Sequence, residues 1–175
     1  MTRPWPGWLL LLIGLSMLTS HAAASAELYQ DAQWGYRLEV PADWSTKVVL
    51  VNEGKPPYVI KQKTFFTGPG GPAIVLDLWT NDDGLSLEQW FEKHRKLLIP
   101  EQAEVPAGPN GLIGDRPIIR IRNPQQQACD QLLTFFARGG LIFRLEYRIT
   151  DGLAAEPIYQ QMLSSFRLEG NDDER

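Results

Sequence analysis

Few residues in this chain can support metal or acid-base chemistry. Its 175 residues include one cysteine, Cys129, and two histidines, His21 and His94. One cysteine excludes an internal disulfide. A structural zinc site needs four nitrogen or sulfur ligands, and a catalytic one needs about three. We therefore expect no metal and no cofactor, although sites made of carboxylates alone are left open.

Positive charge is also scarce. The chain has 17 Lys and Arg against 21 Asp and Glu, a formal net charge of -4. Nucleic-acid binding depends on a basic surface that neutralises phosphates, so a nucleic-acid partner is not expected.

Long apolar runs are lacking except at the N-terminus. Leu9–Leu18 follows Arg3, and small residues up to Ala26 suit a cleavage site. A membrane-spanning helix needs ~20 apolar residues, so this run is too short. We expect residues 1–26 to be a signal peptide, cleaved near Ala26, that exports the chain to the periplasm or the exterior. The alternative is an uncleaved anchor, for which Trp5 and Trp8 would be ordinary interfacial residues.

What remains has the composition of one globular domain, with 43% hydrophobic and 22% charged residues over the whole chain. We assign 27–170 to a single domain and 171–175 to a disordered tail. A domain of this size buries ~68 to 70% of its unfolded surface, enough for one core without disulfides. We expect a monomer without a membrane span after cleavage, with Cys129 in the core.

Alternating apolar residues between turn residues predict strands. Tyr36, Leu38 and Val40 alternate with charged residues and precede Pro41, the pattern of a half-buried strand. The same reasoning predicts strands at Lys47–Val51, Tyr58–Phe66, Ala73–Trp79 and Ile118–Ile121.

A long hairpin is predicted near the C-terminus. Gly139 and Gly140 supply the positive φ angles of a two-residue turn between strands at Cys129–Arg138 and Leu141–Ile149. The turn aligns three pairs on one face and leaves three charged residues on the other. The pairs are Phe136 with Phe143, Thr134 with Leu145 and Leu132 with Tyr147, and the charged residues are Arg144, Glu146 and Arg148.

Two helices are expected. Ser86 and Gln89 form a capping box, and Pro100 ends the helix near Ile99. Its apolar face comprises Leu87, Trp90, Phe91 and Leu98. The second helix, Ala155–Phe166, has an apolar face of Ile158, Tyr159, Met162, Leu163 and Phe166.

This order of elements lacks a repeating strand-helix alternation, which predicts hairpin-connected strands. The expected fold class is α+β, an antiparallel sheet of about six or seven strands flanked by helices in an α/β/α sandwich.

The sequence offers little support for catalysis. A Cys129/His94 dyad is conceivable, but the cysteine falls within a predicted strand and His94 falls at the edge of an apolar helix face. Asn81-Asp82-Asp83-Gly84 has the composition of a turn rather than the spaced acidic residues of a calcium loop. We expect the protein not to be an enzyme.

Two surface features suggest binding. Arg120, Arg122, Arg144 and Arg148 alternate on two predicted strands as a basic stripe for a partner, or as a solvated face that Glu146 neutralises. Trp34 and Trp44 are candidates for stacking on a ligand such as a glycan, with core packing as the alternative.

Both ends of the expected domain resemble the PsbP-like family. The opening motif runs from Tyr29 through Gly35-Tyr36-Arg37-Leu38-Glu39-Val40-Pro41 to Trp44, and the closing helix ends Met162-Leu163-x-Ser165-Phe166-Arg167. The resemblance implies an α/β/α sandwich and mostly non-enzymatic roles in binding or assembly. It transfers no functional residue. The signal peptide fits exported bacterial members rather than plastid ones.

These observations lead to one expected function and one alternative. We expect an exported, non-enzymatic binding or assembly-accessory protein of the cell envelope, with an envelope protein as its partner. The alternative is a module that binds a small ligand or glycan through exposed tryptophans. A hydrolase is third, because no sequence feature favours it.

Overall fold

The computed structural model describes residues 25–53, 60–71, 73–99, 103–123, 130–149 and 156–168. Most of the expected signal peptide, Cys129 and the expected tail lie outside these residues. The described elements are, in chain order, β1 (Ala26–Asp31), β2 (Tyr36–Pro41), β3 (Ser45–Glu53), β4 (Ile60–Thr67), β5 (Ala73–Thr80), α1 (Leu87–Leu98), β6 (Gly111–Ile113), β7 (Arg116–Asn123), β8 (Asp130–Arg138), β9 (Leu141–Ile149), α2 (Glu156–Ser165) and β10 (Arg167–Leu168).

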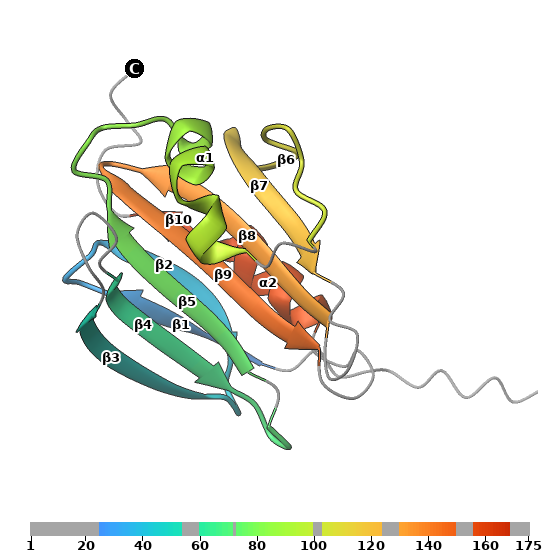
Figure 1. Ribbon diagram of the computed structural model, residues 1–175. Coiled ribbons are helices and arrows are strands. Elements are labelled where there is room, and N and C mark those ends of the chain that lie inside the picture. The colour runs from blue at the N-terminus through green and yellow to red at the C-terminus, as the bar shows by residue number, and fades with distance from the viewer. Residues whose placement is uncertain are drawn as a thin grey trace, which may run out of the picture.

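The strands form two antiparallel sheets (Figure 1). The large sheet has seven strands in the order β3-β4-β5-β9-β8-β7-β6, and the small sheet has three in the order β1-β2-β10. The α+β class and the antiparallel large sheet are as predicted. The small sheet was not expected. The apolar alternation of β2 predicts a half-buried strand, but it does not tell which sheet the strand belongs to.

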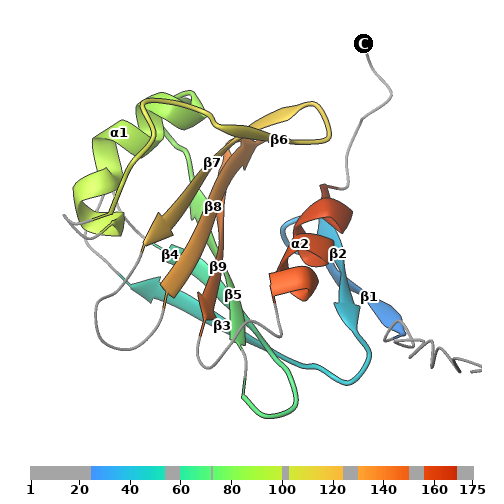
Figure 2. The same cartoon turned by 90° about the vertical axis from the view of Figure 1, so that its right-hand side faces the viewer.

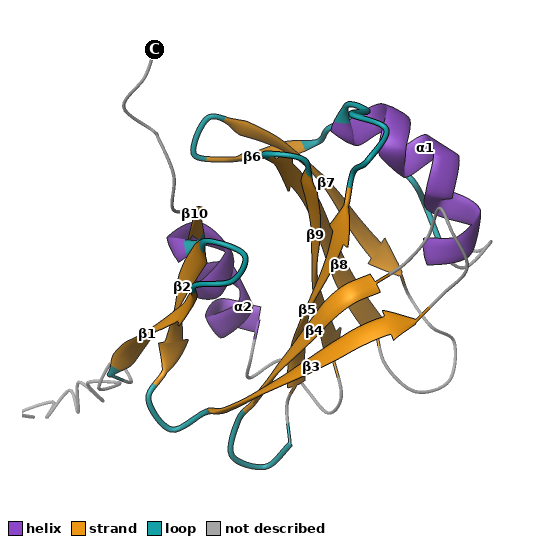
Figure 3. Ribbon diagram, turned by 90° about the vertical axis from the view of Figure 1, so that its left-hand side faces the viewer, coloured by secondary structure: helices purple, strands orange, loops and turns teal. Residues whose placement is uncertain are grey.

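The elements stack in three layers. One face of the large sheet carries α1, and the other carries α2 together with the small sheet (Figures 2 and 3). Within the described residues, no helix is long and apolar enough to cross a membrane.

The β8-β9 hairpin has the predicted register. Phe136 pairs with Phe143, Thr134 with Leu145 and Leu132 with Tyr147. Gly139 and Gly140 have φ angles of 57° and 77°, so both occupy the left-handed region that a side chain would disfavour. The turn chemistry therefore determined the register of this hairpin.

Each face of the large sheet has its own hydrophobic core. On the α2 side, Phe143 stacks on Phe136 at 5.2 Å between ring centroids, and Tyr159 of α2 stacks on Tyr147 of β9 at 5.9 Å. On the α1 side, Phe91 of the helix meets Phe135 of β8 edge-on at 5.1 Å. The two helices are thus held by aromatic contacts with opposite faces of the β8-β9 hairpin.

The start of α1 follows the predicted capping box. Ser86 Oγ accepts from the Gln89 backbone N–H, and Gln89 Oε1 accepts from the Ser86 backbone N–H. The four apolar residues of the predicted face are buried, together with His94. This cap and face fix how α1 lies on the sheet, and so fix which helix residues stay accessible.

Candidate functional site

The four arginines do not form the single stripe that the sequence suggested. Arg120 pairs across the strands with Thr134, whose side of the sheet faces α2. Arg144 pairs with Phe135 and Asp77, whose side faces α1. By the same strand alternation, Arg122 shares the face of Arg120, and Arg148 shares that of Arg144. The stripe is corrected to two pairs of arginines on opposite faces.

The α1-side pair belongs to a chain of ions with both signs. Asp77, whose side chain is fully buried, contacts Lys63 Nζ at 2.9 Å and also pairs with Arg144. Glu146 bridges Arg144 at 3.3 Å and Arg148 at 2.7 Å. This arrangement matches the alternative of a neutralised face, because Asp77 and Glu146 form ion pairs with Arg144 and Arg148.

The candidate tryptophans lie at opposite ends of β2 and are both half-buried. Trp34 Nε1 donates to Gln62 Oε1 at 2.8 Å. Trp44 packs over Gly68 and lines a small pocket of about 120 Å³. Six residues of strand span ~20 Å, so the two indoles cannot stack on one sugar ring. Both indoles pack against the core on the α2 side, and their stacking on a ligand stays a prediction.

His94 is buried on α1, with 4% of its surface exposed. Its Nδ1 donates to the Trp90 carbonyl at 2.7 Å, and its ring lies 4.5 Å from the Trp90 ring. Because Cys129 is outside the described residues, the geometry of the dyad stays untested.

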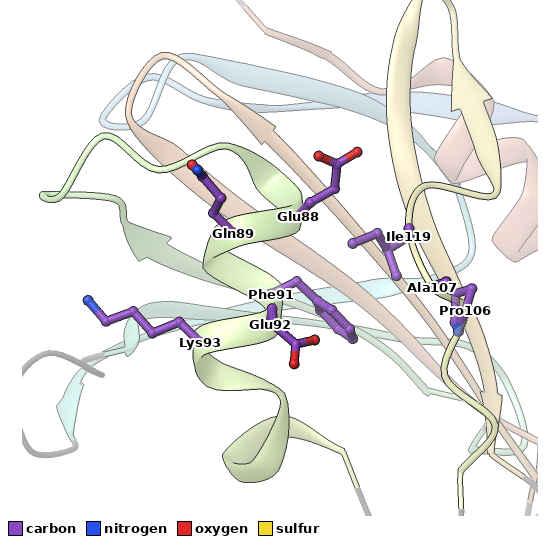
Figure 4. Close-up of a pocket in the computed structure, with 9 residues that line it drawn as sticks. Glu88, Gln89, Phe91, Glu92, Lys93, Pro106, Ala107 and Ile119 are labelled. Carbon is purple, nitrogen blue, oxygen red and sulfur yellow. The ribbon is translucent and has the colours of Figure 1, made fainter.

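The candidate site is an open groove beside α1, with a volume of about 620 Å³ (Figure 4). One wall is α1 and the other is the loop that precedes β6. The floor is apolar: Phe91 of α1 points toward the loop, and Ile119 of β7 lies beside it. Pro106 and Ala107 form the loop wall.

Carboxylates mark the helix side of the groove. Glu88 and Glu92 are both exposed and stand one helical turn apart. Lys93 also lines the groove and pairs with Asp83 at 2.6 Å, while Arg95 pairs with Glu92 at 3.2 Å. The groove therefore combines an apolar floor with a rim that is acidic on balance.

Sequence reasoning placed the charged residues of this helix away from its apolar face and took Pro106–Gly114 as a connection. It missed the groove because the groove depends on how that loop passes α1. The only local signal is the pair of carboxylates at i, i+4 on either side of Phe91.

Comparison with known proteins shows the fold and no more. No family model matches the chain, and no curated protein matches it. The solution structure of cyanobacterial PsbP (CyanoP) from Synechocystis sp. PCC 6803 is similar, with a TM-score of 0.54 and 13% identity, covering 88% of this chain and 98% of that one. A crystal structure from Bacteroides thetaiotaomicron has a TM-score of 0.53 and 10% identity, covering 85% of this chain and 50% of that one. The chain therefore has a PsbP-like α+β fold.

Proposed function

We propose that this chain is an exported, non-enzymatic binding protein of the cell envelope, a member of the PsbP-like family, and that it docks a partner protein in the groove beside α1. The observation that carries this proposal is the groove itself, with its apolar floor and accessible carboxylate rim. Export rests on the N-terminal apolar run, and the family on the terminal motifs together with the fold.

The shape of the groove favours a segment of protein over a small molecule. Its volume of about 620 Å³ is within the ordinary range for ligand sites. A small-molecule site, however, usually encloses most of its ligand, whereas this groove lies open between a helix and a loop. An extended segment can lie in such a groove while the rest of the partner covers the rim.

Site-specific photocrosslinking in the native envelope tests this proposal. A photoreactive residue replaces Ala107 on the loop wall, and the matched control replaces Ala32, which is exposed in the turn between β1 and β2. We expect one protein to crosslink at position 107 and to co-purify in stoichiometric amount. The same protein should not crosslink at position 32.

A variant that fills part of the groove with a bulky side chain is the second test of groove docking. Gly108→Trp adds volume at the loop wall, where a Cβ meets no atom within 4 Å. With the photoreactive residue at 107, this change should abolish the crosslink without unfolding the chain. Equal crosslinking at both positions, or a crosslink that survives Gly108→Trp, would contradict groove docking. A chain that crosslinks to no protein and whose tryptophan fluorescence shifts with glycans would favour the ligand-binding alternative.

A further inference from the structure

The side chains around the groove define the chemistry of what it can accept, if the proposed function holds. Glu88 has an exposed side chain in the first turn of α1, and the Glu92 side chain is 65% exposed. Carboxylates spaced by four residues on a helix lie on the same side of it, with Cβ atoms about 5 to 6 Å apart. Both can therefore approach one group lying across the groove.

The nearby cations leave this rim negative. Lys93 also lines the groove, but its ammonium group is held by an ion pair with Asp83. Arg95 contacts one oxygen of Glu92, Oε1, at 3.2 Å. Glu88, Glu92 and the Asp83 partner of Lys93 are three carboxylates against the two cations Lys93 and Arg95, which leaves one negative charge.

Apolar residues line the groove next to the two carboxylates. Phe91 lies between Glu88 and Glu92 along the helix and points toward the loop. Phe91 and Ile119 are almost completely buried, so the accessible apolar surface of the groove is that of Pro106 and Ala107. A long cationic side chain suits this arrangement, because its aliphatic stem lies on apolar surface while its charged end reaches a carboxylate. An arginine adds planar donors that match a carboxylate in two hydrogen bonds. An acidic segment would instead meet like charge.

We infer that the groove binds an extended segment of the partner in which a lysine or arginine stands next to an apolar residue. The cationic group pairs with Glu88 and Glu92, and the apolar neighbour packs against Pro106 and Ala107 on the loop wall. Glu88 also stabilises the first turn of α1 through its position at the positive end of the helix dipole. That effect acts on the stability of the chain and not on its choice of peptide, so binding and stability measurements separate the two.

A random peptide library displayed on phage, selected on the chain without residues 1–26, is the probe. The groove variant is Glu88→Gln/Glu92→Gln, which removes charge with little change in shape. The matched control is Glu27→Gln/Glu39→Gln, which removes two exposed carboxylates from the small sheet. Urea unfolding of each variant first establishes that it is folded.

We expect enriched peptides to carry lysine or arginine beside an aliphatic or aromatic residue. The affinity of an enriched peptide, measured by fluorescence anisotropy, should fall about five- to tenfold in the groove variant and stay unchanged in the control. It should also weaken as salt is raised. Enrichment of acidic or uncharged peptides, equal affinity for the groove variant, or no enrichment at all would overturn the inference.

The two experiments separate this inference from the proposed function. A partner that crosslinks at position 107 through a segment without a cation would sustain groove docking and defeat the inference. If the selected peptides bind as expected but position 107 crosslinks to no envelope protein, the inferred chemistry stands and the proposed function fails.

Discussion

Gln62 on β4 donates a hydrogen bond from Nε2 to Asp31 Oδ2 at 2.6 Å, and this contact joins the large sheet to the end of β1 in the small sheet. Gln62 Oε1 also accepts from Trp34 Nε1, and Thr64 Oγ1 lies 3.1 Å from Gln62 Nε2. Gln62 and Thr64 are almost completely buried. The small sheet is therefore attached by a buried polar network as well as by the aromatic core.

Replacing this glutamine should weaken that attachment. In Gln62→Leu, the buried Asp31 carboxylate loses a donor and the Trp34 indole loses its acceptor. We expect the free energy of unfolding to fall by about 2 to 4 kcal/mol, because buried polar groups are left unpaired. Urea unfolding measures it, and Gln33→Leu, at an exposed turn position, is the control. Equal denaturation midpoints for the two variants would show that the network does not contribute to stability.

Two aspartates in ion pairs should differ sharply in their effect on stability. Asp77 is fully buried between Lys63 and Arg144, and Asp83 pairs with Lys93 at the surface. Asp77→Ala leaves a largely buried guanidinium with fewer partners, so we expect a loss of about 2 to 4 kcal/mol. Asp83→Ala should change stability little, because water and salt screen its pair. Thermal unfolding at low and high salt compares them, and a larger loss at Asp83 would contradict the burial argument.

Trp44 restricts what can replace Gly68. A Cβ at position 68 would lie 2.6 Å from Trp44 Cε2, closer than such atoms approach. Gly68→Ala should push the indole aside, lower stability by about 1 to 3 kcal/mol and change tryptophan fluorescence. Gly108→Ala is the control, because a Cβ there meets nothing within 4 Å. If Gly68→Ala leaves emission and midpoint unchanged, the indole is not seated on Gly68.

Local chemistry predicted those parts of the fold that are local. The Gly139-Gly140 turn fixed the register of β8 and β9, and Ser86 with Gln89 fixed the start of α1. β1 and β6 were missed for a physical reason. Glu27, Leu28 and Gln30 of β1 are exposed, so this edge strand has no clear apolar alternation, and β6 lies in a stretch rich in proline and glycine.

The arrangement of the surface could not be predicted in the same way. The sequence between β7 and β8 has no two-residue turn motif like Gly139-Gly140, so it leaves open which residues of β7 share a face with those of β8. In the structure Ile119 pairs with Phe135, which places Arg120 on the side of Thr134 and away from Arg144. A shift of one residue would have reversed this, because strand side chains alternate between faces. The groove beside α1 depends on a tertiary contact of a loop, so it could not be predicted from the sequence either.

Buried tyrosines should make the protein sensitive to alkaline pH. Burial raises the pKa of Tyr36 and Tyr159 above the ordinary value of 10.0, and it raises that of the half-buried Tyr29 in the same direction. Tyr159 Oη donates to the Leu145 carbonyl at 3.2 Å, a bond that requires the protonated phenol. Above pH 10 the unfolded chain therefore releases protons that the folded chain keeps.

The sign of the effect follows from this difference in bound protons. Stability should be intact below pH 10 and should fall as pH rises toward the folded-state pKa values, at up to about 1.4 kcal/mol per pH unit for each buried tyrosine. Lysines titrate in the same range, so the comparison is with Tyr36→Phe and Tyr159→Phe. Each variant loses a hydrogen bond and should be less stable at neutral pH, yet its stability should fall less steeply above pH 10. Urea unfolding at several alkaline pH values gives the slopes, and slopes parallel to that of the unmodified chain would show that these phenols do not control the alkaline limit.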